Sequence, residues 1–323
     1  MPQSLTSIKD LLAARGLAPK KSLGQNFLVD HNLIRKLVDV SGIQENEIAL
    51  EIGPGTGVLT DELLSRNIRV IACELDNGLH TLLQERLAPQ IASGQLTLIH
   101  GDCLDGKRAL NPELRRLLSG APSPREGVGG GSAISQLAST SPIAIPNASS
   151  SPPPSFRLIA NLPYGAATPL ITNLLLDYPN CSSQFVTVQK EVADRLGAAP
   201  DTADYGPLSV IASATAHVEK IAKLPPECFW PRPDVTSAMI GIRRRPDPLT
   251  PRAHDLADFI QSLFEQRRKQ LGGILREKFS VRDPFAYPPG ITPKTRAENL
   301  SPQQLLALML AVESGNDRTS AVS

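Results

Sequence analysis

The chain contains 323 residues, of which 41% are hydrophobic, enough for one large α/β domain and a smaller second one. Its formal net charge of +1 excludes a globally basic nucleic-acid binder, so any nucleic-acid surface must be local. The four cysteines, Cys73, Cys103, Cys181 and Cys228, form no C-x-x-C pair. This spacing argues against a zinc site and a disulfide framework, and we expect reduced thiols and no metal.

Membrane and secretory signals are not apparent in the sequence. The longest apolar run, residues 305–312, is far too short to span a membrane. Residues 1–21 contain no long apolar stretch of the kind found in secretory signals. We therefore expect a cytoplasmic protein that does not associate with membranes.

The first predicted element is a short amphipathic helix near the N-terminus. Ser7 and Asp10 have the spacing of a capping box, and Ile8, Leu11 and Leu12 would share one face of the helix. A basic segment that contains glycine, KKSLGQNFLVD, follows it.

From Ile48 onward, short apolar strands alternate with helical stretches. The predicted strands are IALEIG, RVIACEL, LTLIHGD, FRLIAN and QFVTVQK, and helical patterns such as VLTDELLSR and TPLITNLLLDY lie between them. This alternation predicts an α/β fold with a mostly parallel, doubly wound sheet. Two later apolar segments, HVEKIAKL and VTSAMIGIRRR, predict an antiparallel hairpin at a sheet edge, which would end the first domain, residues 1–245.

Residues 246–323 predict a small all-helical domain. Its helices are expected over residues 251–278 and 301–313, the second with Ser301 as N-cap and Gln304 completing a capping box. Residues 118–155 interrupt the α/β order. They are rich in Ser, Pro, Gly and Ala, which predicts a mobile, low-complexity insertion.

The segment EIGPGTG, residues 51–57, follows the first predicted sheet strand and precedes a helix. Its glycines allow a tight turn and let a ligand approach the backbone at a helix N-terminus. The dinucleotide fingerprint is G-x-G-x-x-G, whereas this loop has G-x-G-x-G with Glu51 two residues before Gly53. That variant resembles motif I of the S-adenosylmethionine (SAM)-dependent methyltransferases. The alternative is a purely structural glycine turn.

Two acids stand at the ends of the next two predicted strands. The carboxylate of Glu74 could accept hydrogen bonds from both hydroxyls of a ribose, and a solvated acid at a strand end is the alternative. Asp102 could accept the amino hydrogens of an adenine ring, although its position alone does not decide this.

The tetrapeptide Asn161-Leu162-Pro163-Tyr164 ends the fourth predicted sheet strand, where open α/β sheets bind ligands. The Asn161 side-chain oxygen and a backbone carbonyl held by Pro163 could accept two hydrogen bonds from an exocyclic amine, while Tyr164 offers a face for a base to stack on. Fixing a weakly nucleophilic aryl amine in line with a sulfonium methyl would then require no strong general base. The alternative is a turn with a buried tyrosine.

Ten segments occur in the order found in the ribosomal RNA adenine N6,N6-dimethyltransferases: LGQNFLVD, LEIGPGTGVLT, CELD, GD, ANLPY, QKEVADRL, YGPLSV, FWPRPDVTSAMI, FEQRRKQL and RAENLS. The chain resembles this family from about residue 16 to 312, and within it the bacterial 16S rRNA enzymes. The resemblance implies a Rossmann-like SAM-dependent methyltransferase domain with a small helical C-terminal domain. It also implies dimethylation of two adjacent adenosines near the 3′ end of small-subunit rRNA, within a pre-ribosomal particle, by a monomer.

The resemblance also assigns residues. Asn26 and Leu28 are similar to the family's cofactor contacts, alongside Gly53, Glu74, Asp102 and Asn161. Asn161 and Tyr164 would hold the target adenine, and Phe229 looks like its second stacking face. For Phe229 the alternative is a core aromatic at a strand start.

Basic clusters and other functions stay open at this point. Lys20 with Lys21, residues 243–245 and residues 267–269 are suited to phosphates, but each could equally be a solvated face. The segment QLGG after residue 269 departs from the family pattern and weakens an RNA role for that helix. Alternatives are methylation of a large-subunit adenine, a SAM-binding assembly factor, and a nicotinamide dehydrogenase, which the glycine spacing disfavours.

Overall fold

A computed structural model describes residues 4–106, 109–119, 153–282 and 284–320. Most of the insertion predicted over residues 118–155 lies outside these described residues. Seven strands form one sheet in the order β4-β3-β2-β5-β6-β9-β7. Their bounds are β2 Ile48–Ile52, β3 Arg69–Glu74, β4 Leu96–His100, β5 Phe156–Asn161, β6 Cys181–Gln189, β7 Ala216–Leu224 and β9 Ser237–Arg244.

The sheet is parallel from β4 to β6, whereas β9 runs antiparallel to both β6 and β7. The predicted α/β class is therefore confirmed, together with an antiparallel pair that leaves β7 at the edge. Strand β5 pairs directly with β2, although more than one hundred residues separate them in the chain. This pairing places the end of β5 beside the glycine loop after β2, at the point where the strand order changes direction.

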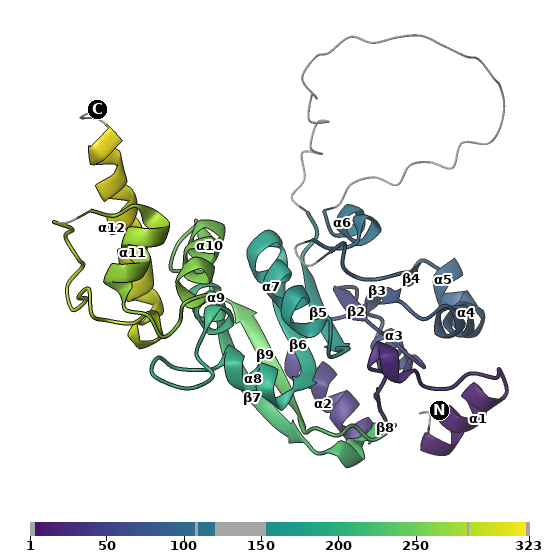
Figure 1. Ribbon diagram of the computed structural model, residues 1–323. Coiled ribbons are helices and arrows are strands. Elements are labelled where there is room, and N and C mark those ends of the chain that lie inside the picture. Colours follow the sequence, from purple (N-terminus) through teal and green to yellow (C-terminus); the bar gives the residue numbers. More distant parts are fainter. Residues whose placement is uncertain (1–3, 107–108, 120–152, 283, 321–323) are drawn as a thin grey trace, which may run out of the picture.

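Helices cover both faces of the sheet (Figure 1). One hydrophobic cluster joins one face to α6, α7, α8 and α9, and a second joins the other face to α1, α2, α3 and α4. The bounds of the helices that follow α1 are α2 His31–Ser41, α3 Val58–Ser65, α4 Asn77–Arg86, α5 Ala88–Ala92, α6 Pro112–Leu118, α7 Ala167–Asp177, α8 Lys190–Leu196 and α9 Pro207–Thr215.

The N-terminal helix, α1 (Leu5–Ala13), begins earlier than the capping pattern predicts. Ser4, not Ser7, is the N-cap: its backbone is extended and its hydroxyl accepts the Ser7 N–H at 3.1 Å. Ser7 lies inside the helix, where its own hydroxyl donates to the Ser4 carbonyl. Ile8 and Leu12 are buried, as expected for the apolar face.

A small two-stranded sheet shares one hydrophobic cluster with α1 and a face of the main sheet. Strand β1 (Phe27–Leu28) pairs antiparallel with β8 (Phe229–Trp230), and the short helices η1 (Lys21–Leu23) and η2 (Pro226–Cys228) precede these strands. The rings of Phe27 and Trp230 stack with their centroids 6.2 Å apart. This pairing holds the segment before α2 against the proline-rich connection between β7 and β9.

The C-terminal helices are α10 (Ala253–Phe264), α11 (Leu271–Phe279) and α12 (Pro302–Ser320), with the short helix η3 (Ala297–Asn299) before α12. The prediction of one helix over residues 251–278 is wrong. After α10 the main chain turns, and Leu271 and Gly272 donate to the carbonyls of Thr295 and Pro293. The capping box of Ser301 and Gln304 is confirmed, with bonds of 3.0 and 3.2 Å.

These helices lie together at one end of the molecule, far from α1 and α4 in Figure 1. Their core includes Tyr205, Val210 and Ala214, which come from α9 and the loop before it. Arg267 reinforces the junction, because it donates to the carbonyls of Thr202 and Ala203 and pairs with Glu298. The domain boundary at residue 245 stays a prediction.

Candidate active site

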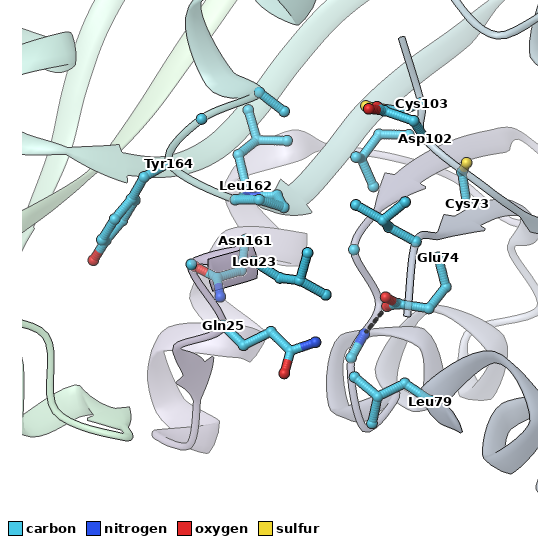
Figure 2. A pocket seen from close by; sticks show the side chains of 18 of the residues that line it. Leu23, Gln25, Cys73, Glu74, Leu79, Asp102, Cys103, Asn161, Leu162 and Tyr164 are labelled. Carbon is cyan, nitrogen blue, oxygen red and sulfur yellow. Dashed lines mark hydrogen bonds between the residues drawn. The ribbon is translucent and has the colours of Figure 1, made fainter. Parts of the chain in front are cut away.

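A cavity of about 480 Å³ opens at the carboxyl ends of β2, β3, β4 and β5. This volume is typical of small-molecule sites. Figure 2 shows Glu74 on one side of the cavity, with Asn161 and Tyr164 on the other. Its wall is built from residues 21–27, the glycine loop, Cys73 to Leu75 with Leu79, residues 101–104 and residues 161–166.

The glycine loop presents its backbone to this cavity. Gly53 and Gly55 have φ angles of 68° and 61°, which favour glycine. A Cβ at Gly55 would lie 2.8 Å from the Phe27 ring, and one at Gly53 would lie 3.0 Å from Pro163. The loop is thus a cradle with no room for side chains, and a ligand can rest directly on its main chain at the start of α3.

Glu74 lies on the cavity wall and is only 4% exposed. One carboxylate oxygen accepts the Gly55 N–H at 3.0 Å, and the other accepts the Asp76 N–H at 2.8 Å (Figure 2 shows the first bond). Burial raises the pKa of Glu74, against the lowering effect of these backbone hydrogen bonds. Each oxygen keeps a second lone pair, so the carboxylate can still accept from a ribose diol.

Asp102 lies on the same wall and is exposed. Its Oδ1 accepts the Leu104 N–H at 3.0 Å, while its main-chain carbonyl accepts from the Asn111 side chain at 2.9 Å. These bonds fix the loop after β4 with the carboxylate at the cavity edge.

Asn161 faces the cavity from the end of β5, and both ends of its amide are engaged. Nδ2 donates to the main-chain carbonyl of Asn26 at 2.9 Å, and Oδ1 accepts from the hydroxyl of Thr187. The hydroxyl of Tyr164 bonds to that of Ser237, with 3.2 Å between the oxygens. The structure therefore brings Asn26, Gly53, Glu74, Asp102, Asn161 and Tyr164 together around one cavity.

Leu28 and Phe229 lie apart from that group. They pair with each other across β1 and β8, are 6% and 5% exposed, and are not among the described residues that line the cavity. The neighbouring Phe27 lines it instead. The cofactor role of Leu28 and the stacking role of Phe229 stay predictions.

Glu51, the acid of the glycine motif, lies beneath the loop and is 2% exposed. Its carboxyl accepts a hydrogen bond from the Thr60 hydroxyl at 2.7 Å. Burial raises its pKa from 4.5 to about 8, although the Thr60 bond lowers it. The group is therefore mainly protonated at neutral pH.

Arg86, at the end of α4, supports the glycine loop from behind, and sequence reasoning missed it. Its Nη2 donates to the carbonyls of Thr56 and Gly57 at 3.0 and 3.4 Å, and its Nη1 lies 2.8 Å from both carboxylate oxygens of Asp61. In the sequence it is one charged residue at a helix end, so no local signal distinguishes it.

Gln25 and Asp76 were also missed. Gln25 lines the cavity and donates to Asp76 at 3.2 Å, and Lys20 pairs with the same carboxylate at 2.8 Å. Burial opposes ionisation of Asp76, but the bonds from Lys20, from the Leu79 N–H and from Gln25 outweigh it and lower its pKa. Asp76 is the last residue of CELD, two positions after Glu74. Its place in this segment is the signal that could have identified it.

Several arginines of the proposed basic clusters are already engaged within the protein. Arg244 donates to the carbonyls of Leu174, Leu175, Tyr178 and Cys181 around the end of α7. Arg243 donates to Val40 and lies over the Phe185 ring, and Arg245 donates to Ser213. These contacts argue against residues 243–245 as a phosphate-binding cluster.

All four cysteines are free thiols in the structure. Within the described ranges, no group of three or more His, Cys, Asp or Glu side chains could hold a metal ion. In that same portion of the chain, none of the helices has the length and apolar character needed to cross a membrane.

Comparison with known proteins identifies the family. The family model described as "Ribosomal RNA adenine dimethylase" matches residues 16–313. A relative from Geobacillus sp. (strain WCH70), named ribosomal RNA small subunit methyltransferase A, is 32% identical over 318 residues, covering 94% of this chain and 95% of the relative.

Two solved structures share the fold. A dimethyladenosine transferase from Plasmodium falciparum has a TM-score of 0.62 at 19% identity and covers 89% of this chain and 97% of its own. The 23S rRNA methyltransferase ErmE has a TM-score of 0.56 at 21% identity, with 89% and 100% coverage. The family match spans both the α/β sheet and the C-terminal helices. The chain therefore belongs to the ribosomal RNA adenine dimethylase family.

Proposed function

We propose that this protein transfers methyl groups from SAM to N6 of two adjacent adenosines near the 3′ end of small-subunit rRNA, forming N6,N6-dimethyladenosines. The observation that carries the proposal is the position of Asn161-Leu162-Pro163-Tyr164 on the cavity wall, directly across from Glu74 and against the glycine loop. Family membership and the names of the curated relatives support the choice of substrate.

The half of the cavity lined by the glycine loop, Glu74 and Asp102 would hold SAM, the methyl donor. The Gly53 and Gly55 cradle would receive the methionine part, Glu74 the ribose hydroxyls and Asp102 the adenine amino group. Asn26 and, by resemblance, Leu28 would complete this half. When bound, SAM supplies an electrophilic methyl group on a positively charged sulfur.

The acceptor half would hold the adenine amine. Oδ1 of Asn161 and the main-chain carbonyl of Leu162 would each accept one N6 hydrogen, which directs the nitrogen lone pair towards the methyl group. Tyr164 would stack on one face of the base, and Phe229 on the other. Phe229 is buried against β1, so this second contact would require the β1–β8 pair to shift.

We further propose that the substrate is rRNA within a pre-ribosomal particle, that the protein acts as a monomer, and that it works in the cytoplasm, where such particles are assembled. Lys21, which is exposed at the cavity rim, is placed to meet a phosphate near the target base.

The test incubates the protein with labelled SAM and undermethylated small subunits, and in a parallel reaction with large subunits, and the modified nucleotides are mapped by mass spectrometry. We expect dimethyladenosine at two adjacent small-subunit positions, while label only on a large-subunit adenine would contradict the proposal. Asn161→Ala should lower transfer by at least about 100-fold and leave SAM binding within about threefold. Asn32→Ala, which removes an exposed amide on α2, is the matched control.

If the Asn161→Ala protein restored subunit assembly in cells as well as the natural chain, the protein would be a SAM-binding assembly factor instead. That result would refute methyl transfer as its main role.

A further inference from the structure

Strand β6 supplies one residue that holds both groups assigned to the target amine. We infer that Thr187 is a positioning residue for methyl transfer, whose hydroxyl orients the Asn161 side chain while its main-chain carbonyl holds Leu162. This inference rests on the proposed function, because that function makes Asn161 and Leu162 the acceptors for N6.

The two contacts follow from the strand register. Thr187 lies directly opposite Asn161 in the parallel pairing of β5 with β6. Its Oγ1 donates a hydrogen bond to Oδ1 of Asn161, and its carbonyl accepts the Leu162 N–H at 3.1 Å. Thr187 is only 1% exposed, so water does not compete for either contact.

The amide of Asn161 consequently has a single orientation. Its Nδ2 donates to the Asn26 carbonyl at 2.9 Å, and a carbonyl can only accept. If the amide were flipped, Oδ1 of Asn161 would face the Asn26 carbonyl oxygen, and neither atom could donate a hydrogen bond. The amide oxygen therefore faces Thr187. The hydroxyl of Thr187 occupies one of the two lone pairs on Oδ1 and leaves the other for an incoming N–H.

Thr187 makes its two contacts with the groups assigned to the methyl acceptor, and other residues hold Gly53 and Glu74. Gly53 donates to the Cys73 carbonyl, and the Glu74 carboxylate accepts from the N–H groups of Gly55 and Asp76. A misplacement of about 1 Å in a reacting geometry can lower a rate by about 100-fold. Loss of the Thr187 hydroxyl should therefore affect turnover and not SAM affinity.

Three variants of β6 make the test. Thr187→Val keeps the branched shape and the main-chain carbonyl but removes the hydroxyl, and Thr187→Ser keeps the hydroxyl. Ser183→Ala is the matched control: it also removes a buried hydroxyl from β6, one that has no hydrogen-bond partner in the described structure. Ser183 lies opposite Arg157, towards the other end of β5.

The measurements are kcat on undermethylated small subunits and SAM affinity by calorimetry. We expect Thr187→Val to lower kcat by about 10- to 100-fold with SAM affinity within about twofold. Thr187→Ser should stay within about threefold of the natural chain in kcat, and Ser183→Ala should be unchanged.

A second readout does not depend on turnover. The side-chain amide resonance of Asn161, assigned by its absence in Asn161→Ala, should shift in Thr187→Val and stay in place in Thr187→Ser. An unshifted resonance in Thr187→Val would overturn the inference. So would a kcat within about twofold of the natural chain for Thr187→Val, or an equal loss in Thr187→Ser. Failure of the proposed function is distinguishable, since the natural chain itself would then transfer no methyl group.

Discussion

Replacing Glu51 by Gln is expected to stabilise the protein increasingly as the pH rises, relative to the natural chain. Glu51 is 2% exposed, and burial raises its pKa from 4.5 to about 8. At neutral pH the folded protein therefore holds a protonated carboxyl, while the unfolded chain carries an ionised one. The Glu51→Gln variant keeps the shape of the protonated acid and an oxygen that can accept from Thr60.

The magnitude follows from the two pKa values. Below pH 4.5 the carboxyl is protonated in both states, and its contribution to stability is fully present. As the pH rises from 4.5 to about 8, the unfolded chain releases the proton before the folded one does, so the free energy of unfolding falls. The fall is up to about 1.4 kcal/mol per pH unit, or roughly 5 kcal/mol over the whole interval.

The assay is denaturant unfolding of both proteins at intervals from pH 5 to pH 9. The amide of the variant does not titrate, and all other groups cancel in the comparison, so the difference in unfolding free energy isolates Glu51. We expect it to grow in favour of Glu51→Gln up to about pH 8 and then to level off.

A difference that stays constant across this range would refute the reasoning, because it would mean that the pKa of the Glu51 carboxyl is not raised in the folded protein.

Three further predictions concern the glycine loop and the arginines. Gly55→Ala should weaken SAM binding by at least about tenfold in calorimetry, since it combines a φ of 61° with a Cβ 2.8 Å from the Phe27 ring. Gly94→Ala is the control, because Gly94 has a φ of 75° and an added Cβ there would have no atom within 4 Å. Equal SAM affinity in both variants would contradict the role of the glycine loop as a cradle for SAM. Arg86→Met removes the donors to the Thr56 and Gly57 carbonyls, so the SAM Kd should rise by about tenfold; a Kd within about twofold would mean that the loop keeps its shape unaided. Arg244→Met leaves four carbonyls around the end of α7 without their donor and should lower the unfolding free energy by about 3 kcal/mol. Arg232→Met, at an exposed ion pair, should change it by about 0.5 kcal/mol or less, and equal losses in denaturant unfolding would disprove the capping role of Arg244.

Local patterns predicted most of the elements in this chain. The alternation of apolar strands and helical stretches located the parallel strands of the main sheet, two later apolar segments located β7 and β9, and Ser301 with Gln304 identified the start of α12. Two local predictions failed. Ser4, not Ser7, is the N-cap of α1. The helix expected over residues 251–278 is divided into α10 and α11, and the first residues of α11 donate to the carbonyls of residues 295 and 293.

Long-range contacts give the arginines of residues 243–245 a structural role. In the sequence, residues 243–245 form a run of positive charge, a pattern typical of phosphate binding or of a solvated face. In the fold, Arg244 lies at the end of α7 and meets carbonyls more than sixty residues away. A run of positive charge in the sequence does not reveal which main-chain carbonyls lie close to it in the fold. The sequence therefore could not distinguish a structural role for Arg244 from phosphate binding or a solvated face.

The sequence by itself determined the strand-end chemistry: Glu74 and Asn161 each end a strand, Asp102 lies just after the end of β4, and parallel strands present their carboxyl ends at one edge of the sheet. The tertiary structure alone decided which groups hold those side chains. The pairing of β5 with β2 and β6 sets Asn161 between the Asn26 carbonyl and Thr187, and α4 brings Arg86 to the back of the glycine loop. The physical reason is distance along the chain, because hydrophobic periodicity reports neighbours two to four residues apart. The contacts that orient this site join residues from 26 to 135 positions apart.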